Sequence, residues 1–382
     1  MTDKLLVCAE VDSSAVTNRK IFEAPFFEAL LTVKEAALKS LNGLGLADEE
    51  KCAQVLQAIE SLRKSGHGLK HCSLLLSNRA LNQAVDDAIL AAADGLGFKE
   101  QAERHRWLLQ RMQTADDVVA TAKNLVAAQA IHQVEAAARR MKVSLREKAG
   151  QFAQQASIAR RRLRDDAETT LGEVFESYAA MFETVEKNIR RSCSGEMVSF
   201  MGTDIGLKEP LSESRAFARR VCCELQKQVY EIVCLPENPL AGQGMNSSLI
   251  AMHGNVQACA VVFWKLGRDL RLLCSGPRCG FEQISLPALA PGSSIMPGKV
   301  NPVILEMAMS TADQVSANHS GLVMGCLTGW LEFGSESIVP TRAFVISCHL
   351  LSLTMINVVE QCVDGITANE QRCCEFAELF PV

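Results

Sequence analysis

The chain has 382 residues, of which 48% are hydrophobic and 22% charged, and its formal net charge at pH 7 is −5. That length and apolar content suffice for a large core in one to three domains. The small negative charge excludes a general affinity for nucleic acid or another polyanion. Only 5% of the residues are aromatic, a composition that suits helix-on-helix packing.

The fifteen cysteines include no C-x-x-C pair, and no Cys/His cluster has the spacing of zinc ligands, so neither a metal nor another cofactor is expected. The start, MTDK, lacks the apolar region of a signal peptide, and no apolar run reaches 18 residues. Neither secretion nor a membrane span is therefore predicted. We expect reduced thiols, in the cytoplasm or the mitochondrial matrix, rather than a disulfide framework.

The first part of the chain predicts an N-terminal lobe of small helices. Residues 1–20 are expected to form an irregular arm, and residues 65–69, with two glycines, a loop. Apolar residues at helical spacing predict short helices, which cover residues 25–41, 47–62 and 80–93. We place the end of this lobe at residue 112.

From residue 113 the expected helices lengthen. The Ala-rich, proline-free stretch 116–159 predicts one long helix, with a potential interruption near Gly150. Further helices are predicted over about 171–189, 217–229, 247–273 and 344–359. The last two are apolar all round, so they must be buried inside a bundle or between subunits. No strand-forming alternation is present, and the predicted fold is an all-α bundle of long helices.

His253 lies on one of the apolar helices. It is expected to be a core histidine that is hydrogen-bonded along the bundle.

The segment 292–302 reads GSSIMPGKVNP. Asparagine is a preferred N-cap and proline suits the first helical position, so Asn301 is predicted to cap a helix that starts at Pro302. The free N–H groups at that helix end and the charge of Lys299 would together favour an anion. The sequence therefore predicts an anion site at this loop.

Two hydroxyls, Ser293 and Ser294, lie beside the predicted anion site. The combination suits a carboxylate substrate that loses a proton to a serine base, while Lys299 and the helix end hold the developing negative charge. The residues alone leave an ordinary capped turn and a flexible lid open as alternatives. A Walker A phosphate loop fits poorly, because five residues separate the glycines and valine follows the lysine.

The segment 292–302, preceded by SGPRCG at 275–280, resembles the signature of the fumarase/aspartase superfamily. Farther on, GITAN at 365–369 is more similar to aspartase than to fumarase. The resemblance implies a five-helix central domain that builds a tetramer through a twenty-helix core. Relative to that family the chain looks shortened, so we expect a central bundle over 113–368 and a short C-terminal remnant over 369–382.

The resemblance also implies roles for the signature residues. Ser293 would be the base that removes the Cβ proton, while Lys299 and Asn301 would bind the substrate carboxylate and stabilise the aci-carboxylate intermediate. Ser294 would join them in binding substrate. In this family three segments from three subunits form each active site.

The first of the other two segments is the stretch 77–83, SNRALNQ, which is similar to the family's substrate-binding TS and NMN string. Ser77 and Asn78 fit the pattern and are predicted to bind substrate, as is Thr203. The family's substrate loop, HPND, corresponds to RHRWLLQ at 104–110, where its proline and asparagines are lost. Substrate placement is therefore expected to differ from that in the family.

The second segment is ARRRLRD at 159–165, in register with the family's GRTHLQD because TLG follows in both. The family's histidine thus becomes Arg162. An arginine run is ordinarily a solvated face. In fumarases that histidine pairs with a glutamate at the position of Glu306, so the register predicts an Arg162–Glu306 pair across subunits. Arginine stays ionised and cannot shuttle protons.

Three functions follow. The favoured one is a catalytically degenerate lyase homologue that serves as a structural or assembly subunit. The second is an active enzyme, similar to aspartate ammonia-lyase or fumarate hydratase, that eliminates ammonia or water from a small dicarboxylate to give fumarate. The third is a heteromeric partner that completes the active sites of a full-length paralogue. A homotetramer or a hetero-oligomer is expected in each case.

Overall fold

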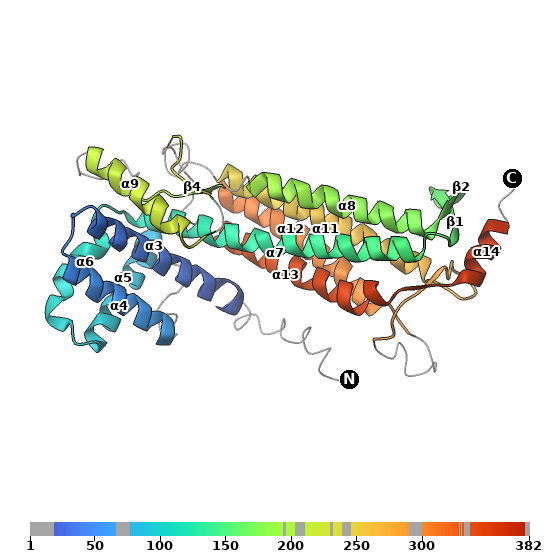
Figure 1. The fold of residues 1–382 in the computed structure, drawn as a ribbon, viewed down its shortest axis with the longest axis horizontal. Helices are drawn as coiled ribbons and strands as arrows, with labels where there is room; N and C mark the ends of the chain where they lie inside the picture. The colour runs from blue at the N-terminus through green and yellow to red at the C-terminus, as the bar shows by residue number, and fades with distance from the viewer. Residues whose placement is uncertain are drawn as a thin grey trace. The chain divides into compact units, whose positions relative to one another are not determined.

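The structure is a computed structural model. It describes residues 19–65, 77–193, 196–202, 211–229, 232–238, 246–289, 300–327, 329, 331 and 337–378. Most of these residues are α-helical (Figure 1), so the predicted all-α class is confirmed. The expected arm over 1–20 and the expected loop over 65–69 lie almost wholly outside the described residues.

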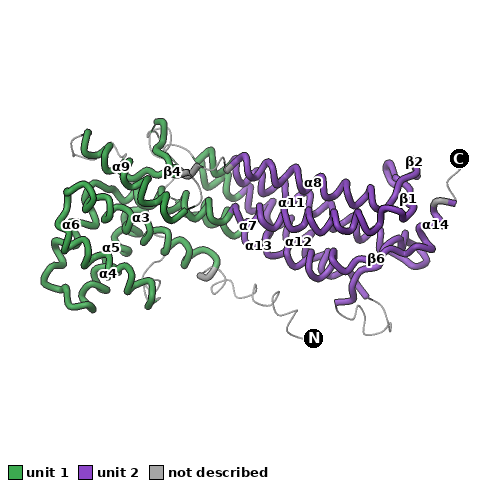
Figure 2. Tube along the Cα trace, in the orientation of Figure 1, with its two compact units in different colours: residues 1–130, 193–250, 321–346 green, residues 131–192, 251–320, 347–382 purple. Residues whose placement is uncertain are grey.

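The chain divides into two compact units (Figure 2), and each is discontinuous in sequence. The first comprises residues 1–130, 193–250 and 321–346, and the second comprises residues 131–192, 251–320 and 347–382. The predicted boundaries after residues 112 and 368 divide the chain contiguously, and that division stays a prediction.

The first unit contains the small helices. They are α3 (Ala24–Gly43), α4 (Glu49–Ser65), α5 (Asn78–Gly95), α6 (Ala102–Gln110) and α9 (Leu211–Gln226), with the short turns η2 (Arg19–Glu23) and η4 (Lys99–Gln101). Helix α3 packs against α4 and α9, and α4 packs against α5. Along α3 the buried residues Phe26, Leu30 and Val33 recur at helical spacing. The three helices predicted for the N-terminal lobe are confirmed.

The first unit also contains a short parallel pair, β3 (Glu196–Val198) and β4 (Ile232–Cys234). The side-chain amide of Asn124 donates to the carbonyl oxygen of Val198 at 2.9 Å. This bond fixes the strand against the start of α7 (Ala115–Gln151).

The second unit is built on long helices. They are α8 (Leu171–Cys193) and parts of α7, α11 (Ser247–Leu273), α12 (Val303–Cys326) and α13 (Val339–Gln361), which lie side by side (Figure 1). Phe182, Phe263, Leu305 and Leu351 are fully buried between them. The helix predicted over 247–273 matches α11 at both ends, and those over 171–189 and 344–359 match α8 and α13. The predicted bundle is confirmed.

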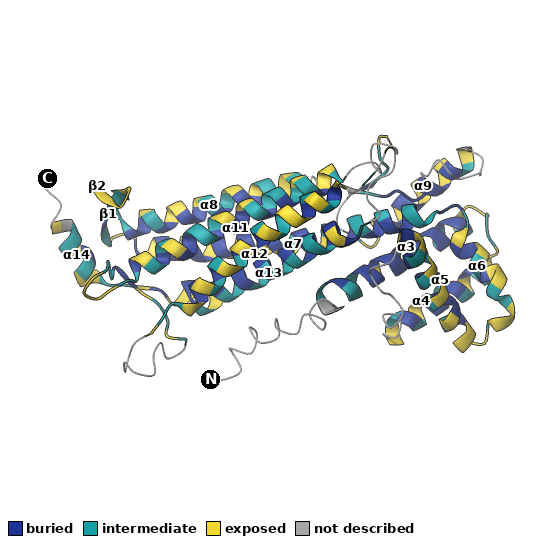
Figure 3. Cartoon of the chain, turned by 180° about the vertical axis from the view of Figure 1, so that it is seen from behind, coloured by how far each residue is buried: buried dark blue, intermediate teal, exposed yellow. Residues whose placement is uncertain are grey.

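Helices α11 and α13 are apolar but not fully covered (Figure 3). Val261 on α11 is 57% exposed. By length and composition, the stretches Ser247–Leu273 and Val339–Gly365 could each cross a membrane. A core helix of a soluble protein passes the same test, so the absence of a membrane span stays a prediction.

One predicted helix is wrong in its last eight residues, and it breaks next to the interruption predicted near Gly150. The helix predicted over 116–159 ends at Gln151, and the chain continues into an antiparallel hairpin, β1 (Ala156–Arg161) and β2 (Arg164–Thr170). The reason is tertiary. The backbone N–H of Gly172 donates to the carbonyl oxygen of Phe152, and a Cβ at Gly172 would lie 2.7 Å from Cα of Ala153. This close approach turns the chain back at the end of α7.

Strands that the sequence did not predict also occur at a second place in this unit. Strands β5 (Ile284–Ser285) and β6 (Thr367–Ala368) form a two-residue antiparallel pair. Helix α14 (Glu370–Glu378) follows β6 directly. The predicted C-terminal remnant is therefore helical over its described part.

Candidate active site

The signature segment is described only at its end. Ser293, Ser294 and Lys299 lie outside the described residues, and so does Thr203. Helix α12 begins at Val303, one residue later than predicted, because the carbonyl oxygen of Pro302 accepts the first helical bond. The N-terminus of α12 thus places the positive end of a helix dipole next to Asn301.

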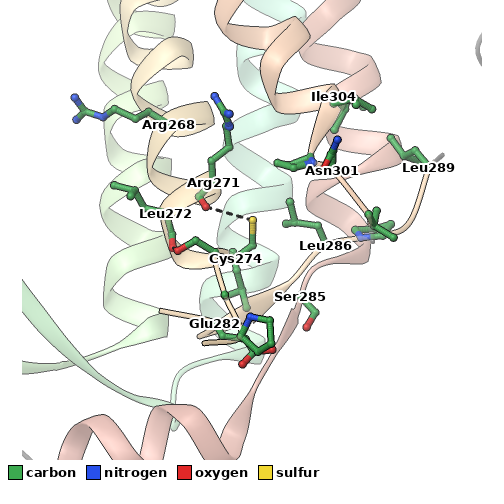
Figure 4. A pocket seen from close by; sticks show the side chains of 18 residues that line it. Arg268, Arg271, Leu272, Cys274, Glu282, Ser285, Leu286, Leu289, Asn301 and Ile304 are labelled. Atoms are coloured by element: carbon green, nitrogen blue, oxygen red, sulfur yellow. Dashed lines mark hydrogen bonds between the residues drawn. The ribbon is translucent and has the colours of Figure 1, made fainter. Parts of the chain in front are cut away.

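A cavity of about 780 Å³ opens beside this helix end. It lies between the end of α11, the segment 275–289 and the start of α12 (Figure 4). Its wall includes Asn301 on one side and Arg268 and Arg271 on the other. The two arginines are three residues apart on α11, so they share a helix face. We call this space the α11–α12 cavity.

The charges of this wall are largely paired. Arg271 donates a hydrogen bond to Glu306 at 3.1 Å, and both side chains are partly exposed. The guanidinium of Arg268 stacks on Trp264 at 5.3 Å and lies 3.4 Å from Asp269. The wall can thus orient an anion, but each guanidinium already contacts a carboxylate.

The residues that line the cavity include a thiol, that of Cys274. Cys274 donates a hydrogen bond to the carbonyl oxygen of Arg271 at 3.4 Å, and burial raises the pKa of this thiol. No histidine is among the described residues that line the cavity. These residues can bind an anion, but they do not include an imidazole to move a proton.

The segment that follows α11 turns tightly around Ser275. The backbone N–H of Glu282 donates to the carbonyl oxygen of Ser275 at 2.8 Å, and that of Phe281 donates to its Oγ at 3.3 Å. A Cβ at Gly280 would lie 2.2 Å from the backbone of Ser275, so only glycine fits there. The structure thus gives a physical reason for the motif SGPRCG, because the turn around Ser275 requires glycine at position 280.

The structure places Arg162 at the tip of the β1–β2 hairpin. Arg162 and Leu163 both have positive φ, 55° and 65°, and both are exposed. The pair predicted between Arg162 and Glu306 joins two subunits, so a single chain does not test it and it stays a prediction. Within the chain the partner of Glu306 is Arg271.

The residues of the first predicted segment lie in the first unit. The hydroxyl oxygen of Ser77 accepts a hydrogen bond from the backbone N–H of Ala80 at 3.4 Å and caps α5. Asn78 is buried, and its amide donates to Asp116 at 2.7 Å. Among the residues that the structure describes, the amide oxygen of Asn78 has no hydrogen-bond partner. A buried acceptor of this kind is available to a donor on a ligand.

The replaced substrate loop, 104–110, forms α6. Leu108 and Leu109 are buried in the first unit, whereas Trp107 is 53% exposed. His105 is buried, and its Nε2 lies 2.9 Å from the amide oxygen of Gln54. Three of the seven residues of this stretch, His105, Leu108 and Leu109, thus belong to the core of the small-helix lobe.

Sequence reasoning missed two residues of the second unit, Arg271 and Gln283, of which Gln283 is fully buried next to Glu282 of the cavity wall. Arg271 could have been found, because Arg268 and Arg271 interrupt an apolar helix on one face. Gln283 gave no signal, since a single glutamine in a loop is usually exposed.

The curated relatives of the chain include fumarate hydratases and aspartate ammonia-lyases. Class II fumarate hydratase of Bordetella parapertussis is 28% identical over 95% of this chain and 80% of its own length. Aspartate ammonia-lyase of Escherichia coli K12 is 25% identical over 95% of this chain and 78% of its own length. A family model described as "Lyase" matches residues 9–317. The chain belongs to the fumarase/aspartase superfamily.

Solved structures of this superfamily share the fold. A "fumarate lyase:delta crystallin" of Brucella melitensis superposes with a TM-score of 0.82 at 28% identity, over 95% of this chain and 86% of that one. A class II fumarase of Schistosoma mansoni gives 0.83 at 23% identity, over 92% of this chain and 78% of that one. The long-helix bundle is therefore that of fumarase/aspartase proteins.

Proposed function

We propose that this fumarase/aspartase homologue binds a small dicarboxylate without eliminating from it and acts as a structural or assembly subunit. The observation that carries the proposal is Arg162, which stands where the family register places a histidine. Arginine stays ionised at physiological pH, so it cannot accept and return a proton. General acid–base catalysis is worth roughly 10²–10⁴-fold in rate.

The α11–α12 cavity supports the binding half of this proposal. Its wall carries Arg268, Arg271 and Asn301, next to the N-terminus of α12. These groups can hold a carboxylate in the ground state. Binding that is no stronger in the transition state does not accelerate the chemical step.

The assembly half is supported by apolar side chains that the chain leaves exposed. Val261 on α11 and Met324 on α12 are 57% and 66% exposed. Helices of this kind suit burial against other subunits. A homotetramer, or a hetero-oligomer with a paralogue, would cover them.

The test measures fumarate formation from aspartate and from malate by the purified protein. Wild type and Ser293→Ala should give equal, negligible rates. Succinate, a dicarboxylate without a leaving group, should still bind the wild type by calorimetry. Turnover that Ser293→Ala abolishes would instead identify an active lyase.

A second arm mixes the protein with a full-length fumarase or aspartase paralogue. We expect the activity of the mixture to equal that of the same amount of paralogue alone. Activity gained in the mixture and lost with Ser293→Ala would identify a heteromeric catalytic partner. The absence of succinate binding would overturn the ligand-binding half.

A further inference from the structure

Gln283 is a fully buried residue of the second unit. It lies between Glu282 and Ile284, which both line the α11–α12 cavity. Its amide oxygen accepts a hydrogen bond from Arg160 at 3.1 Å, and its amide nitrogen donates to the hydroxyl of Ser157 at 3.1 Å. One side chain thus joins the cavity wall to β1.

The backbone of Gln283 joins two further elements. Its N–H donates to the carbonyl oxygen of Leu273, at the end of α11, at 2.9 Å. Its carbonyl oxygen accepts from the N–H of Asn369 at 2.9 Å and from the thiol of Cys373 at 3.7 Å. Gln283 is therefore bonded to the end of α11, to β1 and to the start of α14.

Aromatic stacking reinforces the same junction. The guanidinium of Arg160 lies 4.2 Å from the ring centre of Phe281 and 5.3 Å from that of Phe376 on α14. Arg372 stacks on Phe376 at 4.6 Å and donates to the carbonyl oxygen of Phe281 at 3.2 Å. Guanidinium groups over aromatic faces attract them electrostatically. Helix α14 is thus held to β1 and to the cavity wall together.

The strand pair β5–β6 completes the arrangement. Ile284 pairs with Ala368 and Ser285 with Thr367. The wall residues 282–285 are therefore attached to the segment that leads into α14. We call the contacts of Arg160, Gln283 and α14 the Gln283 clasp.

We propose that Gln283 is a positioning residue for the α11–α12 cavity, and that α14 fixes the cavity wall through it. Loss of the amide would remove the hydrogen-bond partner of Nη2 of half-buried Arg160 and of the buried Ser157 hydroxyl. Such atoms are costly unless they move toward new partners or water. The wall would then open, and the cavity would lose its fixed shape. The ligand part of this inference rests on the proposed function, whereas the effect on the wall does not.

The test compares three variants. Gln283→Leu keeps the size of the side chain but removes both polar atoms. Gln283→Glu keeps an acceptor for Arg160 and for the Ser157 hydroxyl, so it should retain the clasp. Gln155→Ala is the matched control, because Gln155 also contacts α14, through Glu370 at 3.4 Å, but does not line the α11–α12 cavity. The melting temperature of each variant shows that it is folded.

The first readout is the rate at which iodoacetamide alkylates Cys274, which lines the cavity, relative to exposed Cys223. Removing a buried hydrogen bond costs enough to speed local opening on the order of tenfold. We expect that increase in Gln283→Leu and wild-type rates in Gln283→Glu and Gln155→Ala. An unchanged rate in Gln283→Leu would overturn the inference, as would an equal increase in Gln155→Ala.

The second readout is succinate affinity by calorimetry. Gln283→Leu should bind roughly tenfold more weakly than wild type, by the same loss of a buried hydrogen bond. If wild type itself does not bind succinate, the proposed function fails, and the alkylation rates still decide whether Gln283 positions the wall. If Gln283→Leu unfolds, Arg160→Lys takes its place, because lysine lacks the planar guanidinium that stacks on the aromatic rings. This variant should also speed the alkylation of Cys274. A wild-type alkylation rate in Arg160→Lys would contradict the inference.

Discussion

The Nδ1 atoms of His253 and His319 lie 2.9 Å apart, and the two rings are stacked with their centres 5.1 Å apart. One nitrogen must donate and the other accept, so at least one of the two rings, the acceptor, is neutral. Burial, and then the charge of His319, lowers the pKa of His253 to about 4.

This pair predicts acid sensitivity. An unfolded histidine has a pKa of about 6.5, so below that pH the unfolded state binds a proton that the folded state resists. Stability contributed by neutral His253 is therefore complete above pH about 6.5 and falls as the pH drops toward about 4, by up to about 3 kcal/mol. Thermal unfolding across this range should show the loss. His253→Phe should flatten the profile, and identical profiles in this variant and in the wild type would contradict the assignment.

A buried ion pair in the first unit predicts a large mutational cost. Lys34 and Asp86 lie 2.8 Å apart and are completely buried, and the Lys34 ammonium also donates to the carbonyl oxygen of Leu109. Lys34→Met leaves the Asp86 carboxylate buried without its partner, which should cost about 3–5 kcal/mol in urea unfolding. The double variant Lys34→Met/Asp86→Leu should recover most of that loss.

The matched control for the buried pair is its neighbour on the surface. Arg106 and Asp87 lie 2.8 Å apart but are about half exposed, so Arg106→Ala should cost only about 0.2–1 kcal/mol. Equal costs for Lys34→Met and Arg106→Ala would show that burial does not decide the energy of these pairs.

The predicted contact between subunits can be tested by a double-mutant cycle on Arg162 and Glu306. If these residues pair across subunits, Arg162→Ala and Glu306→Gln should each weaken the oligomer, and their combined effect should be smaller than the sum. Because Glu306 already accepts from Arg271, Arg271→Ala should strengthen the dependence on Arg162. Strictly additive effects on the oligomer dissociation constant would mean that the family register is wrong.

Assembly itself predicts a position-dependent response to added charge. Val261 is 57% exposed on α11, and Val261→Glu should shift the protein toward smaller species in sedimentation. Val143 on α7 is also exposed, at 41%, but α7 is not one of the helices predicted to pack between subunits. Val143→Glu should leave the oligomer intact. A stable, soluble wild-type monomer would remove the basis for this prediction.

The thiols should divide into two groups by reactivity. Cysteines whose side chains are described are free, and burial raises the pKa of Cys259 and Cys362 to about 12. The thiolate is the reactive species, so both should resist alkylation in the folded protein. Exposed Cys279 and Cys374 should react before these two thiols, as mass spectrometry after brief alkylation would show. Fast labelling of Cys259 would contradict its burial.

The long helices could be predicted from the sequence because their signal is local. The bounds of α11 follow from an apolar run that begins after a glycine-rich stretch and ends before SGPRCG. His253 on that helix is buried and hydrogen-bonded, as expected. The hairpin 156–170 could not be predicted, because β2 is largely exposed and its charged residues show no alternation. The hairpin forms because the end of α7 contacts Gly172, which is distant in sequence from most of that helix.

The candidate site divides in the same way. Asn301 and the start of α12 could be predicted within one residue, since capping depends on neighbouring residues. The partners of Arg160 could not, because Gln283 and Phe376 are far away in sequence and no local pattern links them. Arg271 lies between these cases, for its helix was predicted but its bond to Glu306 was not.

The Gln283 clasp also bears on the order in which the chain can finish folding during synthesis. Its parts come from β1, from the segment after α11 and from α14, so the last of them leaves the ribosome long after the first. Non-local contacts of this kind form only after the intervening chain is available. Until Asn369 and Phe376 emerge, Gln283 and Arg160 lack only their contacts to these two residues, and the cavity wall is not yet attached to α14 in the nascent chain. Chaperone engagement late in translation would therefore act on this end of the bundle.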